Sequence, residues 1–527
     1  MTNAECETLN GVYLMQLYDD PELNRLPSFE ELASKSKWLK AIPGLPEATM
    51  EWEGSLPFIR DKSDASAKNL AKPIFKASSL AQVFLVLGRL ILALLMAVFD
   101  VPFLVFKRIV NGKSDAGTVR IMEHVGSVLK KSGPSMVKLG QFISTANGIL
   151  PDNIVNSFAW CRDSVPPLDS RLIRRIITEE LDAPPEEIFA SFSKEPMAAA
   201  SIAQAHRAVT KDGRKVVVKV QRPHLKDSFT RDLKAMAIIS WALERVSKTV
   251  AQANLPGFVE LFGTLVFQEI DFRLEACNMV ELGLAAEHAE ANFVVFPRPI
   301  PEFVTPRVLV MEELSGVPYT DAQWGELDDE SREKVLKLVI SGVIEHTLVY
   351  WVFHGDLHAG NVLATPDGVL GLVDYGIVGR LDAIQRVSLV QFLIAFAAQD
   401  TTEMLKSMIT FGAVPEGADI EKLAKKIDSA LPDIDQVTQE QLAETLGVVI
   451  KVLITEGFRL PIPLVLFFKN LLYLNGFAAA VAPNVDLMSQ IEPIFEYFRL
   501  KYGNIMEYLA GELPDRTGWK NNEKDGT

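Results

Sequence analysis

Alternating apolar and polar positions predict strands in the middle of the chain, and apolar positions with helical spacing predict helices around them. Residues 214–222 alternate as a strand that places Lys219 on the face opposite three valines. A second strand is predicted over 306–313, and residues 361–374 form two short strands joined by a Pro-Asp-Gly turn, the pattern of a hairpin. The predicted helical segments are 114–190, 258–290 and 382–511. The pattern as a whole favours an α+β fold.

The most apolar stretch runs from 77 to 99, with Arg89 as its single charge and Gln82 as its single amide. A stretch of this length is long enough to cross a bilayer, but an arginine in mid-span costs about 2.5–3.5 kcal/mol. A buried core helix, a helix lying in a membrane interface and a true span therefore all remain open. Residues 464–481 are also apolar but contain Lys469, Asn470 and Asn475, which favours a core helix there.

Composition narrows the class of protein. The chain has 527 residues, and its 53 basic and 68 acidic side chains give a net charge of −15. This balance argues against a nucleic-acid partner, which needs a basic face for phosphate. The apolar fraction of 48% excludes disorder over most of the chain. The three cysteines form no Cys-x-x-Cys pair, which excludes a zinc ribbon, and so few cysteines suit a reducing compartment. The polar, acidic N-terminus predicts no signal peptide. We therefore expect a cytoplasmic location.

The strongest chemical signal is the run His-Gly-Asp-Leu-His-Ala-Gly-Asn at 354–361, followed by Asp-Tyr-Gly from Asp374. Asp356 precedes Asn361 by five residues, and Asn361 precedes Asp374 by thirteen. Transfer of a nucleotide's terminal phosphate needs a carboxylate at the acceptor, and an amide oxygen and a second carboxylate to hold Mg²⁺. We expect Asp356 at the catalytic-base position and Asn361 and Asp374 as metal ligands.

A nucleotide site also needs a cation for the phosphates, and Lys219 on its apolar strand is the candidate. A carboxylate must hold that lysine, and Glu275 is the best of three acids in the predicted helix. No Gly-x-Gly-x-x-Gly precedes Lys219. An alanine-rich run stands there instead, which is either a phosphate-facing loop or a plain helix segment. The residues proposed to cover the phosphates are Ala198, Ala199, Ala200 and Ser201.

These motifs together resemble the UbiB family of atypical protein-kinase-like ATPases over about residues 114–480. The stretches that carry the resemblance are Val137–Gln141, Ala198–Gln204, Val218–Val220, Glu269–Asp271, His354–Asn361 and Asp374–Gly376. The resemblance implies a two-lobed protein-kinase-like fold with a helical N-terminal extension and a helical C-terminal region. It also implies that a Lys-x-Gly-Gln helix covers the active site, so that Lys138 and Gln141 meet Glu269 and Asp271.

A lysine beside two acids would fill the space of a protein acceptor, which favours ATP hydrolysis or a small, lipid-like acceptor. The resemblance implies ATP or ADP and Mg²⁺ as cofactors and a role in isoprenoid quinone metabolism, usually of ubiquinone, or in lipid metabolism at a membrane. The expected partners are a membrane surface, quinone precursors and quinone-biosynthesis proteins, and in a bacterium the location would be the inner-membrane face. The expected hinge that contacts adenine comprises Met311, Glu312, Glu313 and Leu314.

Five segments are expected from these observations. They are an N-terminal segment (1–110) of short helices and loops that contains the apolar stretch, a helical extension (111–190), an N-lobe (191–316), a C-lobe (317–513) and a polar tail (514–527). Two other functions share part of the pattern: a small-molecule phosphotransferase of the aminoglycoside or choline kinase type, and a nucleotide-binding pseudokinase scaffold. The first lacks the Lys-x-Gly-Gln and alanine-rich elements, and the intact Asp356, Asn361 and Asp374 count against the second.

Overall fold

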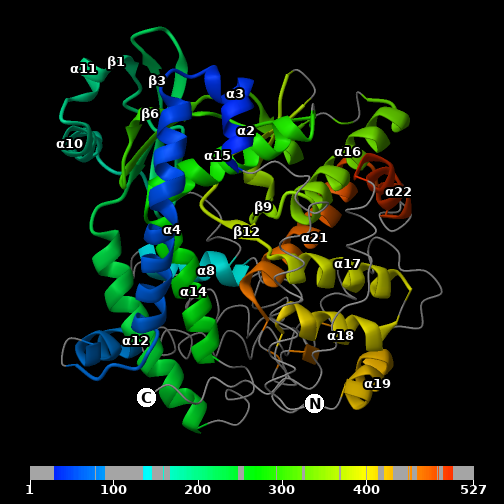
Figure 1. Ribbon diagram of the computed structural model, residues 1–527. Coiled ribbons are helices and arrows are strands. Elements are labelled where there is room, and N and C mark those ends of the chain that lie inside the picture. The colour runs from blue at the N-terminus through cyan, green and yellow to red at the C-terminus, as the bar shows by residue number, and fades with distance from the viewer. Residues whose placement is uncertain are drawn as a thin grey trace, which may run out of the picture.

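The computed structural model describes residues 29–76, 79–88, 134–144, 166–246, 255–291, 293–322, 327–366, 369–398, 400–413, 420–430, 460–483 and 491–502, together with a few single positions between these ranges. Two lobes are visible in Figure 1, one built around an antiparallel sheet and the other mainly helical with two small sheets. The predicted α+β fold with two lobes is therefore confirmed.

The sheet of the first lobe has the strand order β1-β3-β4-β7-β6, and β2 pairs with β3. Its strands are β1 (Phe189–Phe192), β2 (Ala198–Ala199), β3 (Ala203–Thr210), β4 (Lys215–Gln221), β6 (Pro299–Val304) and β7 (Val308–Glu312). The predicted alternation in β4 is present: Val216, Val218 and Val220 are fully buried in one cluster, whereas Val217 packs in another. Lys219 shares the side of Val217, so the strand directs it away from that valine cluster.

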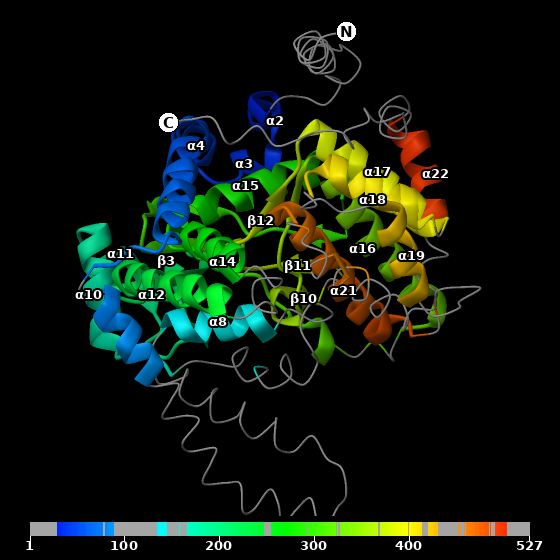
Figure 2. The same cartoon turned by 90° about the horizontal axis from the view of Figure 1, so that it is seen from below.

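Helices cover this sheet and extend below it (Figure 2). They are α8 (Pro134–Ser144), α10 (Ser170–Leu181), α11 (Pro185–Ile188), α12 (Leu225–Val246), α14 (Leu255–Glu269) and α15 (Phe272–His288). The prediction of one helix over 258–290 is wrong, because the chain breaks between α14 and α15. Asp271 causes the new start: its side chain accepts a hydrogen bond from the Arg273 amide and caps α15.

The N-terminal segment packs on the first lobe. Its helices are α2 (Phe29–Lys35), α3 (Lys37–Lys40) and α4 (Leu45–Leu70). The expectation of short helices and loops before residue 78 is wrong for α4, which continues for 26 residues through Pro57. The helix lies along α14 and α15 (Figure 1), and such packing outweighs the local preference of a proline to end a helix.

The second lobe contains small sheets and a bundle of helices. Its strands are β5 (Val294–Val295), β8 (Val317–Pro318), β9 (Val352–His354), β10 (Val362–Ala364), β11 (Leu370–Leu372) and β12 (Val378–Arg380). Its helices are α16 (Asp329–Leu348), α17 (Ala383–Ala397), α18 (Thr401–Phe411), α19 (Ile420–Ala430), α21 (Ile462–Val481) and α22 (Ile491–Tyr502), with one-turn 3₁₀ helices at Tyr319–Asp321 and Ala359–Asn361. The predicted hairpin is present, because β10 and β11 pair antiparallel with Val362 opposite Leu372.

Two apolar segments were interpreted from sequence. By length and composition α21 could cross a membrane, but half of its most apolar window is buried, and Asn470 is completely buried within the C-lobe. The predicted core helix is therefore present. Of the stretch 77–99, the structure describes a helix at Ser79–Gly88, whereas Arg89 lies outside the described residues. Val83 and Val86 of this helix are buried, while its other large apolar side chains, Leu80, Phe84, Leu85 and Leu87, are exposed.

Candidate active site

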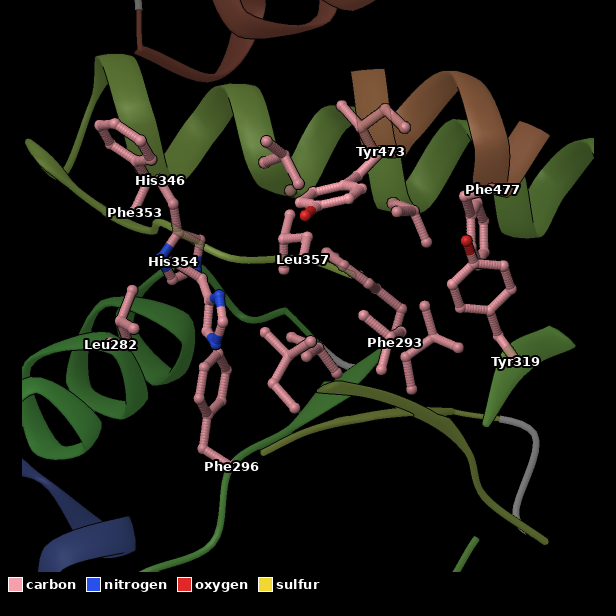
Figure 3. Close-up of a pocket in the computed structure, with 18 residues that line it drawn as sticks. Leu282, Phe293, Phe296, Tyr319, His346, Phe353, His354, Leu357, Tyr473 and Phe477 are labelled. Carbon is pink, nitrogen blue, oxygen red and sulfur yellow. The ribbon is translucent and has the colours of Figure 1, made fainter. Parts of the chain in front are cut away.

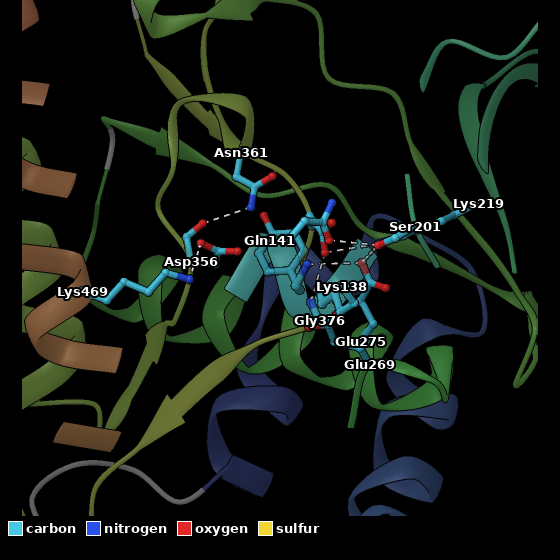
Figure 4. A network of polar contacts seen from close by, with 12 residues as sticks. Lys138, Gln141, Ser201, Lys219, Glu269, Glu275, Asp356, Asn361, Gly376 and Lys469 are labelled. Carbon is cyan, nitrogen blue, oxygen red and sulfur yellow. Dashed lines mark hydrogen bonds and ion pairs between the residues drawn. The ribbon is translucent and has the colours of Figure 1, made fainter. Parts of the chain in front are cut away.

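Lys219 lies between two carboxylates that come from different lobes. Its Nζ is 2.7 Å from Glu275 Oε1 on α15 and 3.3 Å from Asp374 Oδ1 in the loop after β11 (Figure 4). Burial alone would lower the pKa of Lys219, but the nearby carboxylates of Asp374 and Glu275 outweigh burial and raise it. The lysine is therefore a fixed positive charge at the interface of the two lobes.

The Asp-Tyr-Gly turn is held by its own backbone. Asp374 has a left-handed φ of +64°, a conformation that aspartate tolerates better than most residues. Its Oδ1 also lies 3.3 Å from the Gly376 amide, and the Tyr375 amide donates to Glu275 at 3.2 Å. Burial would raise the pKa of Asp374, but Lys219 and Lys138 hold it well below its usual range. The carboxylate is therefore ionised and half exposed, in the state that a cation requires.

The loop that carries Asp356 is fixed from both sides. The backbone amide of Asp356 donates to His354 Nδ1 at 3.1 Å, and the other ring nitrogen of His354 lies 2.9 Å from the Asp374 carbonyl. Asn361 donates from Nδ2 to the carbonyl of Asp356 at 3.0 Å. His354 therefore joins the backbone of Asp356 to that of Asp374, and Asn361 is joined to the same loop through Asp356.

Lys469 on α21 is a functional candidate that the motif reasoning missed. Its Nζ lies 2.8 Å from Asp356 Oδ1, and the adjacent Asn470 donates to the His354 carbonyl at 2.5 Å. Burial raises the pKa of Asp356, but Lys469 and other nearby positive charges more than offset this and lower it. The sequence did contain a signal, because Lys469 and Asn470 are polar residues inside an otherwise apolar helix. Their partners, however, lie 113 or more residues away in the chain and could not be predicted from that pattern.

Helix α8 brings a second lysine into the site. Lys138 Nζ is 2.6 Å from Glu269 Oε2 at the end of α14, and both side chains are largely buried. Burial would lower the pKa of Lys138, but Glu269, Asp374 and Asp356 together raise it. Burial raises the pKa of Glu269, and the attraction of Lys138 only partly opposes that shift. Lys138 therefore stabilises the ionised forms of three carboxylates. Of these three, Glu269 has a raised pKa, whereas those of Asp374 and Asp356 are lowered.

The other predicted lid contacts differ from expectation. Gln141 accepts a hydrogen bond from the Ser201 hydroxyl at 2.9 Å, so α8 also holds the alanine-rich loop. The prediction that Asp271 meets the lid is wrong. Its carboxylate instead binds Arg273 through two hydrogen bonds of 2.9 and 2.6 Å while it caps α15. Among the described residues, the ion-pair partner of Lys138 is Glu269 and that of Asp271 is Arg273.

The alanine-rich run forms a tight hairpin rather than a helix. Ala198 pairs with Ala205 and Ala199 with Gln204, and the Ala200 amide donates to the Ala203 carbonyl at 2.8 Å. This excludes the helix interpretation. Of the predicted hinge residues, Met311 and Glu312 end β7, and Glu313 and Leu314 follow it.

Both hinge acids have arginine partners in the first lobe. Glu312 accepts a hydrogen bond from Arg298 at 2.6 Å and Glu313 one from Arg207 at 2.7 Å. The backbone amides of Glu312 and Glu313 are also engaged, because they donate to the carbonyls of Arg298 and Lys215 at 3.0 and 3.1 Å.

The donor set fits a magnesium ion. Because Asn361 uses its Nδ2 for the Asp356 carbonyl, its amide oxygen is the atom left for a ligand. Asp374 adds an ionised, half-exposed carboxylate. Oxygen atoms from a carboxylate and an amide are the ligands that Mg²⁺ prefers. Asn361 and Asp374 would therefore hold the metal beside Lys219.

Side chains outside the motifs fix α15, the helix that carries Glu275. Asn278 donates to the Tyr375 carbonyl at 2.8 Å and accepts from Arg380 at 2.7 Å, which connects α15 to the turn. On its outer end, Glu287 accepts the backbone amides of Lys37 and Trp38 at 2.9 and 3.0 Å. The N-terminal segment thus supports the helix that positions Glu275.

Comparisons with known proteins find relatives of this chain. Residues 161–408 match the ABC1 atypical kinase-like domain. The probable protein kinase UbiB of Pseudomonas aeruginosa is 32% identical over 379 residues, which cover 70% of this chain and 70% of that protein. An uncharacterized aarF domain-containing protein kinase from the chloroplast of Arabidopsis thaliana is 28% identical over 398 residues, 69% of this chain and 73% of its own. A Mycobacterium tuberculosis protein solved with erythromycin is 23% identical, covers 66% of this chain and 89% of its own, and has a TM-score of 0.44.

Proposed function

Because the chain belongs to the UbiB family of atypical kinase-like proteins, we propose that it binds ATP with Mg²⁺ and uses it for hydrolysis or for phosphoryl transfer to a small, lipid-like acceptor. The observation that carries this proposal is the position of Lys219 between Glu275 and Asp374. This is the arrangement that a kinase-like site uses for nucleotide phosphates.

Each residue of the proposed site has a defined task. Lys219 binds the phosphates, and Glu275 keeps its side chain extended toward the cleft. Asp356 orients the acceptor hydroxyl or water and accepts its proton. Asn361 and Asp374 would hold Mg²⁺, which supplies positive charge against the negative charge of the transferred phosphoryl group. The alanine-rich hairpin from Ala198 to Ser201 covers the phosphates.

The lid supports a small acceptor. Lys138 reaches the carboxylate of Glu269 and also stabilises the ionised forms of Asp374 and Asp356. A peptide acceptor would have to displace this buried cation from its carboxylates, which carries a large desolvation cost. Water or a small acceptor avoids that displacement.

The decisive experiment is ATP turnover by the purified full chain, followed with a phosphate sensor. Lys219→Met should reduce turnover by about tenfold or more while the protein remains folded. Lys215→Met is the matched control, because Lys215 lies on the same strand but is exposed, and it should retain the parent rate. Equal rates for the parent and Lys219→Met would support the pseudokinase scaffold instead.

The metal assignment is tested separately by nucleotide binding. Asp374→Asn should remove the stabilisation that Mg-ATP gives to the parent protein, because the amide lacks the charge that holds the metal. The stabilisation is measured as a shift in melting temperature. An unchanged shift in the variant would contradict the assignment of Asp374 as a metal ligand.

The proposed role in quinone or lipid metabolism at a membrane rests on the family resemblance and on the helix Ser79–Gly88. Its face with Leu80 and Phe84 is exposed, and an apolar helical face of this kind suits a membrane interface. Flotation with phosphatidylglycerol vesicles tests this role: Phe84→Asp should weaken binding, whereas Phe58→Asp, at an exposed position on α4, should not. Quinone-precursor phenols are then added to the vesicles. ATP turnover should rise if these phenols are the phosphoryl acceptors or bind beside the acceptor.

A further inference from the structure

A cavity of about 70 Å³ lies between the second lobe and α15, whose Leu282 contributes to its lining. Side chains of α16 and α21 form its sides, and the β10–β11 hairpin covers it (Figure 3). Val362, Leu370 and Leu372 of the hairpin line it. The alternate position Gly371 faces the other way, where Leu314 of the predicted hinge packs. The hairpin therefore separates this cavity from the proposed nucleotide site.

The walls are mostly apolar, and the side chains with polar atoms among them are Tyr319, His346, His354 and Tyr473. His346 differs from the other histidine because its ring makes no hydrogen bond among the described residues. This residue of α16 is 7% exposed, and neither of its ring nitrogens has a hydrogen-bond partner among the described residues. A buried polar group without a partner costs about 1–3 kcal/mol in proteins, so native structures seldom keep one without a reason. Burial lowers the pKa of His346 to about 4, so the imidazole is neutral at physiological pH. A neutral imidazole has one donor and one acceptor nitrogen.

The chemistry of the walls defines what could fill the space. Apolar walls disfavour a cluster of waters, and a cavity of this volume holds about five or six non-hydrogen atoms when about 12 Å³ is allowed for each. We propose that this cavity is a binding site for a small, neutral, mainly apolar molecule with one hydroxyl or carbonyl group, which hydrogen-bonds His346. No charged ligand fits, because the apolar walls could not replace its hydration.

The position of the cavity makes its occupant an effector of the active site. His354 and Leu357 belong to the loop of Asp356, and both line the cavity (Figure 3). His354 also contacts the backbone of both Asp356 and Asp374. A ligand that packs against His354 would therefore restrict the loop on which the proposed catalytic base depends. This effector role rests on the proposed function, whereas the binding site itself does not.

Binding is tested with cyclopentanol and cyclopentane, a pair of probes that differ only in the hydroxyl group. Methyl resonances of the full chain should shift with cyclopentanol at Val343, Leu357 and Leu370, and its affinity should exceed that of cyclopentane by about fivefold. His346→Phe should remove this preference while apolar binding persists. Equal affinities for the two probes in the parent, or shifts that lie outside the cavity, would overturn the site.

Filling the cavity provides the second test. Val343→Phe, or Val343→Leu if the larger side chain prevents folding, should abolish binding of both probes. Leu338→Phe is the matched control, because Leu338 lies on α16 but is exposed. Retained binding in a folded cavity-filled variant would refute the proposal.

The effector role has its own readout. Cyclopentanol should change the rate of ATP turnover in the parent and in Leu338→Phe but not in the cavity-filled variant. A rate that does not respond despite binding would refute the effector role alone, whereas a parent without any turnover would refute the proposed function and leave the binding result intact.

Discussion

The stability of the protein should depend on pH through His346. Folding depresses the pKa of this imidazole from its ordinary 6.5 to about 4, because burial disfavours the charged form. The unfolded chain therefore binds a proton more readily than the folded one as the pH falls below 6.5. The stabilising contribution of the neutral His346 side chain is therefore fully present above pH 6.5, and it is lost progressively as the pH falls toward 4.

The magnitude follows from the same two pKa values. At pH 5.5, linkage gives a loss of about 1 kcal/mol in the free energy of unfolding relative to neutral pH. This pH is suitable because it stays above the isoelectric point of about 5.1, near which the protein would tend to precipitate. His346→Phe removes the titrating group and keeps a ring that can stack with Phe296, whose centroid is 6.2 Å away.

The assay compares urea unfolding of the parent and of His346→Phe at pH 7.5 and 5.5, with loss of C-lobe structure as the signal. The stability difference between the two proteins should change by about 1 kcal/mol in favour of the variant as the pH falls. His354 is present in both proteins, so its contribution cancels. Parallel loss of stability in parent and variant, or an NMR titration of His346 near pH 6.5, would refute the reasoning.

Three further changes test the contacts around the site. Lys469→Met removes the cation 2.8 Å from Asp356, so the acidic limb of the pH profile of kcat/KM should move to higher pH by about one unit, and an unmoved limb would contradict the coupling. Asn470→Leu leaves the buried His354 carbonyl without this donor and should cost about 1–3 kcal/mol in urea unfolding; a smaller loss would mean that the carbonyl finds another donor. Ala199→Gly loosens the hairpin over the phosphates, so calorimetric titration should show changed affinity for ADP and ATP, and a change in melting temperature alone would argue against a phosphate role.

Local patterns predicted the local structure well. The alternation around Lys219 and the Pro-Asp-Gly turn both depend on neighbours in sequence, so the strand and the hairpin could be read directly. The long helix α4 could not, because Pro57 disfavours it locally and only its packing on α14 and α15 compensates. The partners of Lys469 likewise depend on how α21 crosses the lobe, and no spacing rule reports such a contact.

The three acids near the start of α15 show why the site could be predicted only in part. On one continuous helix, Glu269 and Glu275 would lie about 9 Å apart along the axis and about 120° apart around it, too far around to serve one cleft. The chain solves this by ending α14 at Glu269 and starting α15 at Phe272. Asp271 forms the start of the second helix, because its carboxylate caps α15 and binds Arg273.

The break also has an anchor in the sheet, since Gln221 donates to the Ile270 carbonyl at 2.5 Å. Glu269 is thereby left facing Lys138, and Glu275 faces Lys219. The spacing of apolar residues did not predict the break, so it could not assign Glu269 and Glu275 to different lysines or separate Asp271 from them. What distinguishes them is a helix cap, and with it the sequence could have excluded Asp271 from the lid: an aspartate followed by an apolar helical run is itself a signal for a helix start.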